Sequence, residues 1–288
     1  MTTEIVDVRG PTASFPSAEV VLARAPGENF TVASALLGRR TTRHLRAIYG
    51  YARLVDELGD SAEGDRLELL DVLEEELDRT FAGTPRHPLL QELAETIRAC
   101  RLPKAPFVRL LEANRRDQLQ GDYESFADLL SYGELSANPV GELVLYVFGA
   151  ATKERIALSD DVCTALQLVE HWQDVGEDAR RGRVYLPRED RDRFGVSRGE
   201  LEAPTASAAL RRLLAFECER ASVLLDSGAE LVRSLRGRAR FAVAGYVSGG
   251  RAALHALADC GYDVLAVHAR PSRARRAWFS LRSLGGTG

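Results

Sequence analysis

"GYARLVDELGD", residues 50–60, runs from apolar residues into three carboxylates within five positions. At about 100° per residue, a helix places Tyr49, Arg53, Asp56 and Asp60 on one stripe and mostly apolar residues on its other faces. A helix with this pattern is buried on most sides and turns one polar line toward an internal pocket. The stretch therefore predicts a helical fold with a polar site inside it.

A second stretch, "EHWQDVGED" at residues 170–178, repeats this pattern. Gln167, Glu170, Asp174 and Asp178 form its polar stripe, and the other faces of the predicted helix are largely apolar. A single D-x-x-x-D pair is most often a solvated helix end. Two such pairs, each on a mostly apolar helix, favour a binding site instead.

The two aspartate pairs have the chemistry of a magnesium site. Carboxylates at i and i+4 repel each other, and a divalent cation removes that repulsion. Mg²⁺ binds one or two carboxylates, keeps several waters and shares the phosphates of a substrate. We therefore predict that Asp56, Asp60, Asp174 and Asp178 hold Mg²⁺ together with a diphosphate, and that Arg53 contacts phosphate oxygens.

The rest of the chain is also predicted to be helical, which makes the fold class all-α. Leu, Ala, Arg and Glu dominate, whereas alternating β-branched runs and hairpin turns are scarce. Pro139 falls inside a predicted helix and is expected to kink it. Helices are expected at residues 17–24, 30–37, 41–58, 65–81, 88–99, 105–120, 124–132, 134–151, 159–180, 206–234, 239–260 and 272–281.

Composition and charge narrow the class of protein. Hydrophobic residues make up 45% of the chain and the net charge is -4, which suits a globular protein that does not bind nucleic acid. The four cysteines are scattered, no signal peptide is recognisable, and no apolar run is long enough to span a membrane. The expected location is the cytoplasm.

Three segments are expected along the chain. Residues 1–15 are predicted to be disordered, residues 16–268 to form a single domain, and residues 269–288 to form a basic tail. The tail interleaves arginines with Trp278 and Phe279, which suits peripheral contact with anionic lipid at the inner face of the membrane. A disordered basic tail fits the same composition. The sequence leaves the oligomeric state open.

Several motifs resemble the squalene/phytoene synthase family. "DELGD" at 56–60 and "DVGEDARRGRVYLP" at 174–187 resemble its two aspartate-rich motifs, and the second match is the more specific. "YGELSANPVGELVLYVFG" at 132–149 resembles its tyrosine-containing helix. Its S-A-N-P-V-G motif is most similar to that of the hydroxysqualene synthases, the branch of the family in the bacterial hopanoid pathway. The resemblance covers about residues 20–276.

This resemblance carries expectations about fold and chemistry. It implies the isoprenoid synthase fold, which is a single helical bundle around a central cavity. It also implies Mg²⁺ as the cofactor and a prenyl diphosphate as the substrate. In the hydroxysqualene branch, presqualene diphosphate is ionised, the cation rearranges, and water quenches it.

The resemblance also assigns residues, and it makes the four aspartates named above the metal ligands. Tyr132 matches the family's active-site tyrosine. Asn138 and Glu170, which are polar and lie on helices predicted to line the cavity, are further catalytic candidates to hold the quenching water. The substrate-binding residues implied by position are Asn29, Phe30, Tyr49, Arg53, Gln167, Gln173 and Arg183.

The chain departs from the family pattern near both motifs. Glu57 stands where many members have Asp, Glu170 where many have Asn, and Gln173 where many have Arg. The change at Glu170 adds a negative charge and the change at Gln173 removes a positive one. The second site is therefore more negative, and its phosphate geometry is expected to differ.

The preferred hypothesis is a Mg²⁺-dependent enzyme that converts presqualene diphosphate and water into hydroxysqualene and diphosphate. One alternative is head-to-head condensation of two farnesyl diphosphates to presqualene diphosphate or squalene, in which a hydride quench would need NADPH. An alternative of another class is a non-catalytic family member that acts as a scaffold or assembly factor. The intact aspartate pairs argue against the scaffold. Histidines such as His171 show no metal-ligand spacing and are expected to be packed or surface residues.

Overall fold

The part of the chain that the computed structural model describes comprises residues 5–7, 14–22, 37–267 and 269. Four sequence-based predictions fall outside it. These are the substrate residues Asn29 and Phe30, most of the helix expected at 30–37, the helix expected at 272–281, and nearly all of the basic tail.

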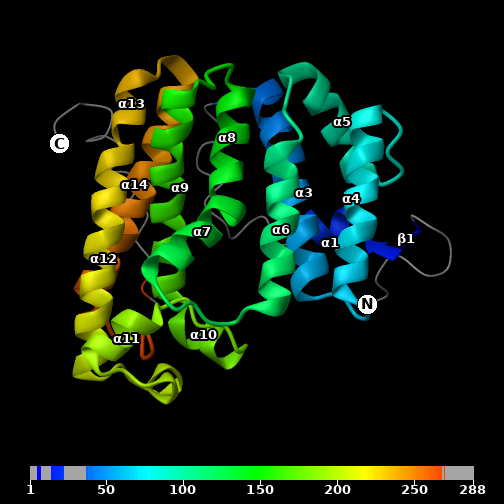
Figure 1. Cartoon of the computed structure of the whole chain (residues 1–288). Helices are drawn as coiled ribbons and strands as arrows, with labels where there is room; N and C mark the ends of the chain where they lie inside the picture. Colours follow the sequence, from blue (N-terminus) through cyan, green and yellow to red (C-terminus); the bar gives the residue numbers. More distant parts are fainter. Residues whose placement is uncertain (1–4, 8–13, 23–36, 268, 270–288) are drawn as a thin grey trace. The chain divides into compact units, whose positions relative to one another are not determined.

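Contacts divide the chain into two compact units. The first comprises residues 1–119 and 139–151, and the second comprises residues 120–138 and 152–288. Helices make up nearly all the regular structure of the described residues in both units, as Figure 1 shows, so the all-α prediction is confirmed.

The first unit holds two short strands and several helices. Its elements are β1 (Ile5–Asp7), β2 (Ser14–Pro16), α1 (Ala18–Leu22), α3 (Arg39–Asp60), α4 (Arg66–Ala82), α5 (Pro88–Cys100), α6 (Ala105–Leu119) and α8 (Asn138–Val147), which joins this unit from Pro139 onward.

The core of the first unit forms around α3. Its apolar face is fully buried at Tyr51, Leu54 and Leu58. The Tyr51 hydroxyl donates to the backbone carbonyl oxygen of Phe107 on α6 at 3.1 Å, and the two rings meet edge to face with centroids 5.1 Å apart. This contact satisfies a buried hydroxyl and fixes α3 against α6. It thereby sets the position of the acidic end of α3.

The first strands lie in a segment for which the sequence predicted no regular structure. β1 and β2 pair in antiparallel fashion, with Val6 opposite Phe15. Phe15 is fully buried, its ring lies 6.1 Å from that of His87, and the Nε2 atom of His87 hydrogen-bonds the carbonyl oxygen of Pro16 at 3.0 Å. One buried aromatic residue thus anchors this segment to the helices, although the local pattern is too short to indicate a strand.

The second unit consists of helices alone among its described residues. Its elements are α7 (Phe126–Ser136), α9 (Lys153–Gln173), α10 (Val175–Arg180), α11 (Arg188–Phe194), the 3₁₀ helix η2 (Arg198–Glu202), α12 (Ala208–Gly228), α13 (Glu230–Ser234) and α14 (Gly237–Asp259). Helix α9 packs most extensively against α12, and Figure 1 shows the two side by side.

Several helix boundaries differ from those predicted, and two of these differences lie near candidate site residues. The helix expected at 159–180 is broken at Asp174, whose backbone (φ -106°, ψ 15°) ends α9 and precedes α10. The prediction that Pro139 kinks a continuous helix is wrong. The chain instead breaks at Ala137, and Pro139 lies in the first turn of α8, where its missing N–H removes no intrahelical bond.

A buried carboxylate cluster lies between α11 and α12. Glu217 and Asp190 are both buried, and Nη1 of Arg220 donates to Oδ2 of Asp190 at 2.6 Å and to Oε1 of Glu217 at 3.4 Å. Arg220 also lies over the rings of Phe126 and Phe216, at 4.4 and 4.3 Å from their centroids. The pKa of Glu217 is raised to about 8, mainly by burial and also by the negative charge of Asp190, whereas Arg220 opposes both effects.

This raised pKa predicts a pH-dependent loss of stability. Below its ordinary pKa of 4.5, Glu217 is protonated in both the folded and the unfolded chain. As pH rises from there through about 8, the unfolded chain loses its proton first, so the stability contributed by protonated Glu217 is lost. We expect Glu217→Gln to remove this loss and to raise Tm above that of the wild type by about 5 °C at about pH 9.

The control for this prediction is Glu219→Gln on the same helix, where the side chain is exposed. Thermal melts of the three proteins over the pH range provide the measurement. If the wild type and Glu217→Gln keep the same Tm difference at acid and alkaline pH, Glu217 does not titrate as a buried group.

Candidate active site

The first aspartate pair lies in the last two turns of α3. Nη1 of Arg53 donates to Oδ2 of Asp56 at 3.4 Å, and Nδ2 of Asn114 on α6 donates to Oδ1 of the same carboxylate at 3.4 Å. The Asp56 side chain is 44% exposed, and that of Arg53 is 19% exposed. Asp56 therefore keeps access to solvent while two donors orient it. Tyr49 and Asp60 lie on the same helix, Tyr49 half-buried and Asp60 exposed.

Helix α6 supports this motif through residues that sequence analysis missed. Asn114 is buried, and Nε2 of Gln118 donates to the carbonyl oxygen of Gly59 at 2.9 Å. A Cβ atom on Gly59 would lie 2.2 Å from Oδ1 of Asn114, so the close approach of Asn114 to the motif depends on the absence of a side chain there. The signal available in the sequence was a polar pair at i and i+4 on an otherwise core-facing helix.

The second aspartate pair spans the junction of α9 and α10. Asp174 is exposed and Asp178 is half-buried, and the N–H of Asp178 donates to the carbonyl oxygen of Asp174 at 2.9 Å. The two carboxylates are thus held one helical turn apart despite the break. The pKa of Asp178 is raised to about 7, mainly by burial and also by the charge of Asp174, whereas Arg183 and Arg181 oppose the shift.

These donor sets fit Mg²⁺ shared with a diphosphate. Among the described residues, no three His, Cys, Asp or Glu side chains gather closely enough to hold a metal by themselves. Mg²⁺ requires fewer protein ligands, because it binds one or two carboxylates and completes its shell with water and phosphate oxygens. A cation beside Asp178 would favour the ionised carboxylate and so lower the pKa of Asp178 again.

An aromatic cluster lies in the same unit as the second pair. The ring of His171 stacks on that of Tyr185 with centroids 3.6 Å apart, and the ring of Tyr132 lies 5.8 Å from Tyr185 and 6.3 Å from His171. Tyr123 also stacks on Tyr185, with ring centroids 5.7 Å apart. Burial and, to a smaller extent, the charge of Arg183 together lower the pKa of His171 to about 3, so the imidazole is neutral at physiological pH.

Sequence analysis placed Tyr132 in the site but not the other three members of this aromatic cluster. Tyr123 and Tyr185 stand in segments without a helical stripe, so no periodic pattern marked them. His171 was expected to be packed or on the surface, and its stacking on Tyr185 gives it a defined position next to Tyr132.

Two further predicted residues, Gln167 and Asn138, have specific contacts in the second unit. The Ser136 hydroxyl donates to Oε1 of Gln167 at 2.8 Å, one turn after Tyr132. The Thr164 hydroxyl donates to Oδ1 of Asn138 at 2.9 Å, and Asn138 is buried.

The other predicted residues of the second motif lie apart from these hydrogen bonds. Gln173 donates through Nε2 to the carbonyl oxygen of Ala269. Glu170 is exposed one turn before Asp174. The backbone N–H of Arg183 donates to the carbonyl oxygen of Asp178 at 2.9 Å, which ties the basic segment to the acidic motif.

The length and hydropathy of the helices decide whether any of them could cross a membrane. Within the described ranges, no helix combines the length and the apolar character that crossing a bilayer requires. Peripheral contact through the basic tail stays a prediction, since that segment lies outside these ranges.

The sequence and the fold both match known proteins. Residues 23–277 match the family model described as squalene/phytoene synthase. The chain is 31% identical over 255 residues to a 15-cis-phytoene synthase of Synechococcus elongatus, a match that covers 82% of each chain. It is 34% identical over 213 residues to a hydroxysqualene synthase of Rhodopseudomonas palustris, covering 73% of this chain and 72% of that one.

A solved structure is similar over most of its length. The crystal structure of squalene synthase HpnC from Alicyclobacillus acidocaldarius superimposes with a TM-score of 0.80 and 43% sequence identity. The superposition covers 85% of this chain and 94% of that one.

Proposed function

Because this chain belongs to the squalene/phytoene synthase family, we propose that it is a Mg²⁺-dependent enzyme that converts presqualene diphosphate and water into hydroxysqualene and diphosphate. The observation that carries the proposal is the composition of the second unit. One segment, residues 174–185, joins an aspartate pair suited to Mg²⁺ to a neutral aromatic cluster suited to a hydrocarbon cation. The relative named hydroxysqualene synthase supports the choice of reaction.

The first chemical step is cleavage of the carbon–oxygen bond to the diphosphate. Mg²⁺, when bound, would supply positive charge to the leaving group. Each aspartate pair is a candidate set of Mg²⁺ ligands within its own unit, Asp56 with Asp60 and Asp174 with Asp178. Arg53 and Arg183 are the candidate donors to phosphate oxygens, because a guanidinium forms charge-assisted hydrogen bonds with them. The departing electron pair stays on the diphosphate oxygen.

The second step is protection and quenching of the carbocation. Tyr132, Tyr185 and the neutral ring of His171 present aromatic faces, which attract a cation without forming a bond to it. A protonated imidazole at this position would repel the cation, and the low pKa of His171 avoids this. Water then forms the new carbon–oxygen bond, and its proton passes to a base such as Glu170 or to the released diphosphate.

Two neutral residues of the second unit are the proposed groups that hold this water. Oδ1 of Asn138 already accepts from Thr164, so Asn138 would act through its amide N–H₂ group. Tyr132 lies one turn before the hydrogen bond between Ser136 and Gln167. We place the water beside Tyr132 and Asn138, which are neutral and can orient it without trapping the cation.

A second candidate function is condensation of two farnesyl diphosphates to presqualene diphosphate or squalene. The observation in its favour is the 43% identity to a protein named squalene synthase. It uses the same metal and diphosphate chemistry but ends without addition of water. A scaffold role is the third candidate, and it requires neither turnover nor binding of diphosphate.

Product analysis separates these functions. Purified protein is incubated with Mg²⁺ and presqualene diphosphate in heavy-oxygen water, with and without NADPH, and in parallel with farnesyl diphosphate. We expect hydroxysqualene that carries the heavy oxygen and forms independently of NADPH. Mass spectrometry identifies the product, and the Asp56→Asn/Asp174→Asn double variant controls for contaminating activity.

The other outcomes each point to a rival. Presqualene diphosphate or squalene formed from farnesyl diphosphate, without conversion of added presqualene diphosphate to the alcohol, would establish the condensation. No turnover together with no Mg²⁺-dependent binding of inorganic diphosphate would leave the scaffold role.

A further inference from the structure

Two segments of the second unit that are distant in sequence run side by side before α7 and before α11. The N–H of Val184 donates to the carbonyl oxygen of Gly121 at 2.7 Å, and Asp122 and Val184 form a parallel β-bridge. The N–H of Arg188 donates to the carbonyl oxygen of Tyr123 at 2.8 Å. Residues 120–124 are thus hydrogen-bonded to the segment that follows the second aspartate motif.

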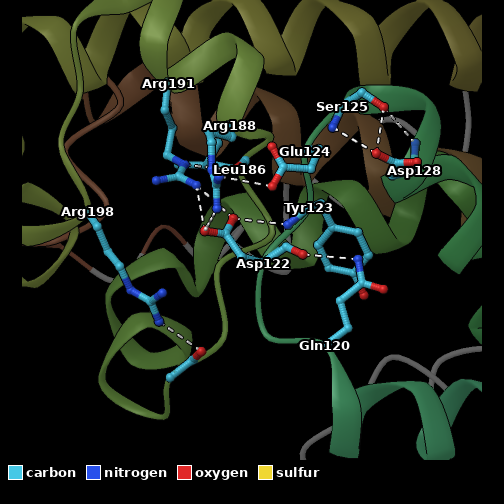
Figure 2. A network of polar contacts seen from close by, with 11 residues as sticks. Gln120, Asp122, Tyr123, Glu124, Ser125, Asp128, Leu186, Arg188, Arg191 and Arg198 are labelled. Atoms are coloured by element: carbon cyan, nitrogen blue, oxygen red, sulfur yellow. Dashed lines mark hydrogen bonds and ion pairs between the residues drawn. The ribbon is translucent and has the colours of Figure 1, made fainter.

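An ion pair with a buried guanidinium reinforces this pairing, as Figure 2 shows. Nη2 of Arg191 donates to both carboxylate oxygens of Asp122, at 2.7 and 2.9 Å. Nε of the same guanidinium donates to the carbonyl oxygen of Leu186 at 3.0 Å. The Arg191 side chain is only 6% exposed and that of Asp122 is 20% exposed. We call this arrangement of Asp122, Arg191 and Leu186 the clasp.

The backbones at the clasp approach too closely for a side chain. A Cβ atom on Gly121 would lie 2.7 Å from the carbonyl oxygen of Gly182. Gly182 itself has φ +84°, a conformation that favours glycine, and its carbonyl oxygen also accepts from Nη2 of Arg198 at 3.0 Å. The ion pair and the close approach of the two backbones therefore hold the same segment in two independent ways.

The clasp joins two segments that both lead to candidate site residues. The segment that follows Asp178 carries Arg183 and Tyr185. In the other segment, Tyr123 follows Asp122 and stacks on Tyr185, and Ser125 caps the N-terminus of α7, the helix that carries Tyr132. Displacement of either segment would shift Tyr185 relative to Tyr132, and would shift Arg183 as well.

We propose that Asp122 and Arg191 are positioning residues that set Arg183 for the diphosphate and Tyr185 for the carbocation. This inference rests on the proposed function, because it assigns the clasp to a diphosphate and hydrocarbon site. Charge-assisted hydrogen bonds from a buried guanidinium are directional, which suits the Arg191–Asp122 pair to holding a segment in one place. The proposal adds a determinant of product choice that contacts neither reacting group.

An exposed pair on the same two segments offers a matched control. Nη1 of Arg188 lies 3.0 Å from Oε1 of Glu124, with side chains 49% and 68% exposed. Exposed ion pairs contribute little to stability or position. Glu124→Gln therefore removes a charge from the same segment and should leave kinetics and products as in the wild type.

The test compares Asp122→Asn, Asp122→Glu, Gly121→Ala and Glu124→Gln at a temperature well below the Tm of each. Because a misplacement of ~1 Å can cost about 100-fold in rate, we expect Asp122→Asn to lower kcat by about 10- to 100-fold and to increase elimination or rearranged products. Gly121→Ala, which changes no charge, should produce the same change in product ratio. Asp122→Glu should restore part of the wild-type rate.

The outcomes distinguish this inference from the proposed function. Calorimetric titration with inorganic diphosphate and Mg²⁺ provides a readout that needs no turnover. Asp122→Asn should bind diphosphate about tenfold more weakly than the wild type, because Arg191 loses its carboxylate partner and the segment that carries Arg183 is no longer held. If Asp122→Asn lowers only the Tm and keeps wild-type kcat, products and diphosphate affinity, the clasp is merely structural and the inference is wrong. If the wild type makes no product but binds diphosphate, the proposed function fails and the affinity of Asp122→Asn decides the inference. If the wild type binds no diphosphate, both are wrong.

Discussion

Replacing Asp174 with asparagine should abolish turnover while leaving the protein folded. The amide keeps the shape of the side chain but removes a negative oxygen ligand that Mg²⁺ prefers. We expect kcat to fall by about 1,000-fold or more, since loss of one group that stabilises developing charge costs about 100- to 1,000-fold and a metal ligand also affects occupancy. Asp56→Asn in the other unit should have the same effect.

The stability of the metal-free variant should move in the opposite direction to its activity. Asp174 is one of the causes of the raised pKa of Asp178, so removing its charge relieves a repulsion in the folded chain. We therefore expect the Tm of metal-free Asp174→Asn to equal or exceed that of the wild type. Addition of Mg²⁺ and diphosphate should raise the Tm of the wild type and not that of the variant.

The matched control is Glu177→Gln in the same acidic stretch. Glu177 directly precedes Asp178 but is not a predicted ligand, and its exposed carboxylate pairs with Arg181 at 2.7 Å. The Glu177→Gln variant should keep turnover within about threefold of the wild type, as expected when an exposed ion pair is lost. Wild-type activity in either aspartate variant would rule out the metal assignment, and a large fall in the metal-free Tm would indicate a structural role.

Periodicity was sufficient to predict the helical class and the faces of the long helices. The stripe of Asp56 and Asp60 on α3 follows from a regular 3.6-residue repeat, and the helix indeed runs to Asp60. The break at Asp174 could not be predicted in this way, because it depends on the fold around one residue rather than on a repeat. Helix ends are also the least regular part of the pattern.

Contacts between distant segments were the second kind of feature that the sequence did not indicate. Asn114 reaches Asp56 from another helix, and Asp122 pairs with Arg191 across 69 positions. Charged residues are common in both segments, so no spacing marks which aspartate meets which arginine. Such pairs are set by the tertiary fold, and they are the features that orient the candidate site.

The packing of α9 against α12 leads to the largest stability effect that we expect. Gly228 ends α12, where a Cβ atom would lie 2.5 Å from Cγ2 of Val162 and 2.9 Å from the carbonyl oxygen of Leu158. Alanine normally stabilises a helix relative to glycine by about 1 kcal/mol. Here the methyl group would meet backbone as well as side chain, so α9 and α12 would have to separate.

Gly228→Ala should therefore destabilise the protein by about 2–4 kcal/mol, which corresponds to a fall in Tm of about 10 °C. Gly245→Ala on α14 is the matched control, because no atom lies within 4 Å of its Cβ position, and it should keep or slightly raise the Tm. Adding Val162→Ala to Gly228→Ala removes the methyl contact but not the contact with the Leu158 carbonyl oxygen. The double variant should consequently recover only part of the lost Tm. Equal Tm values for Gly228→Ala and Gly245→Ala would show that α9 and α12 are not as closely packed at Gly228 as the structure has them, and α9 is the helix that leads into the second aspartate pair.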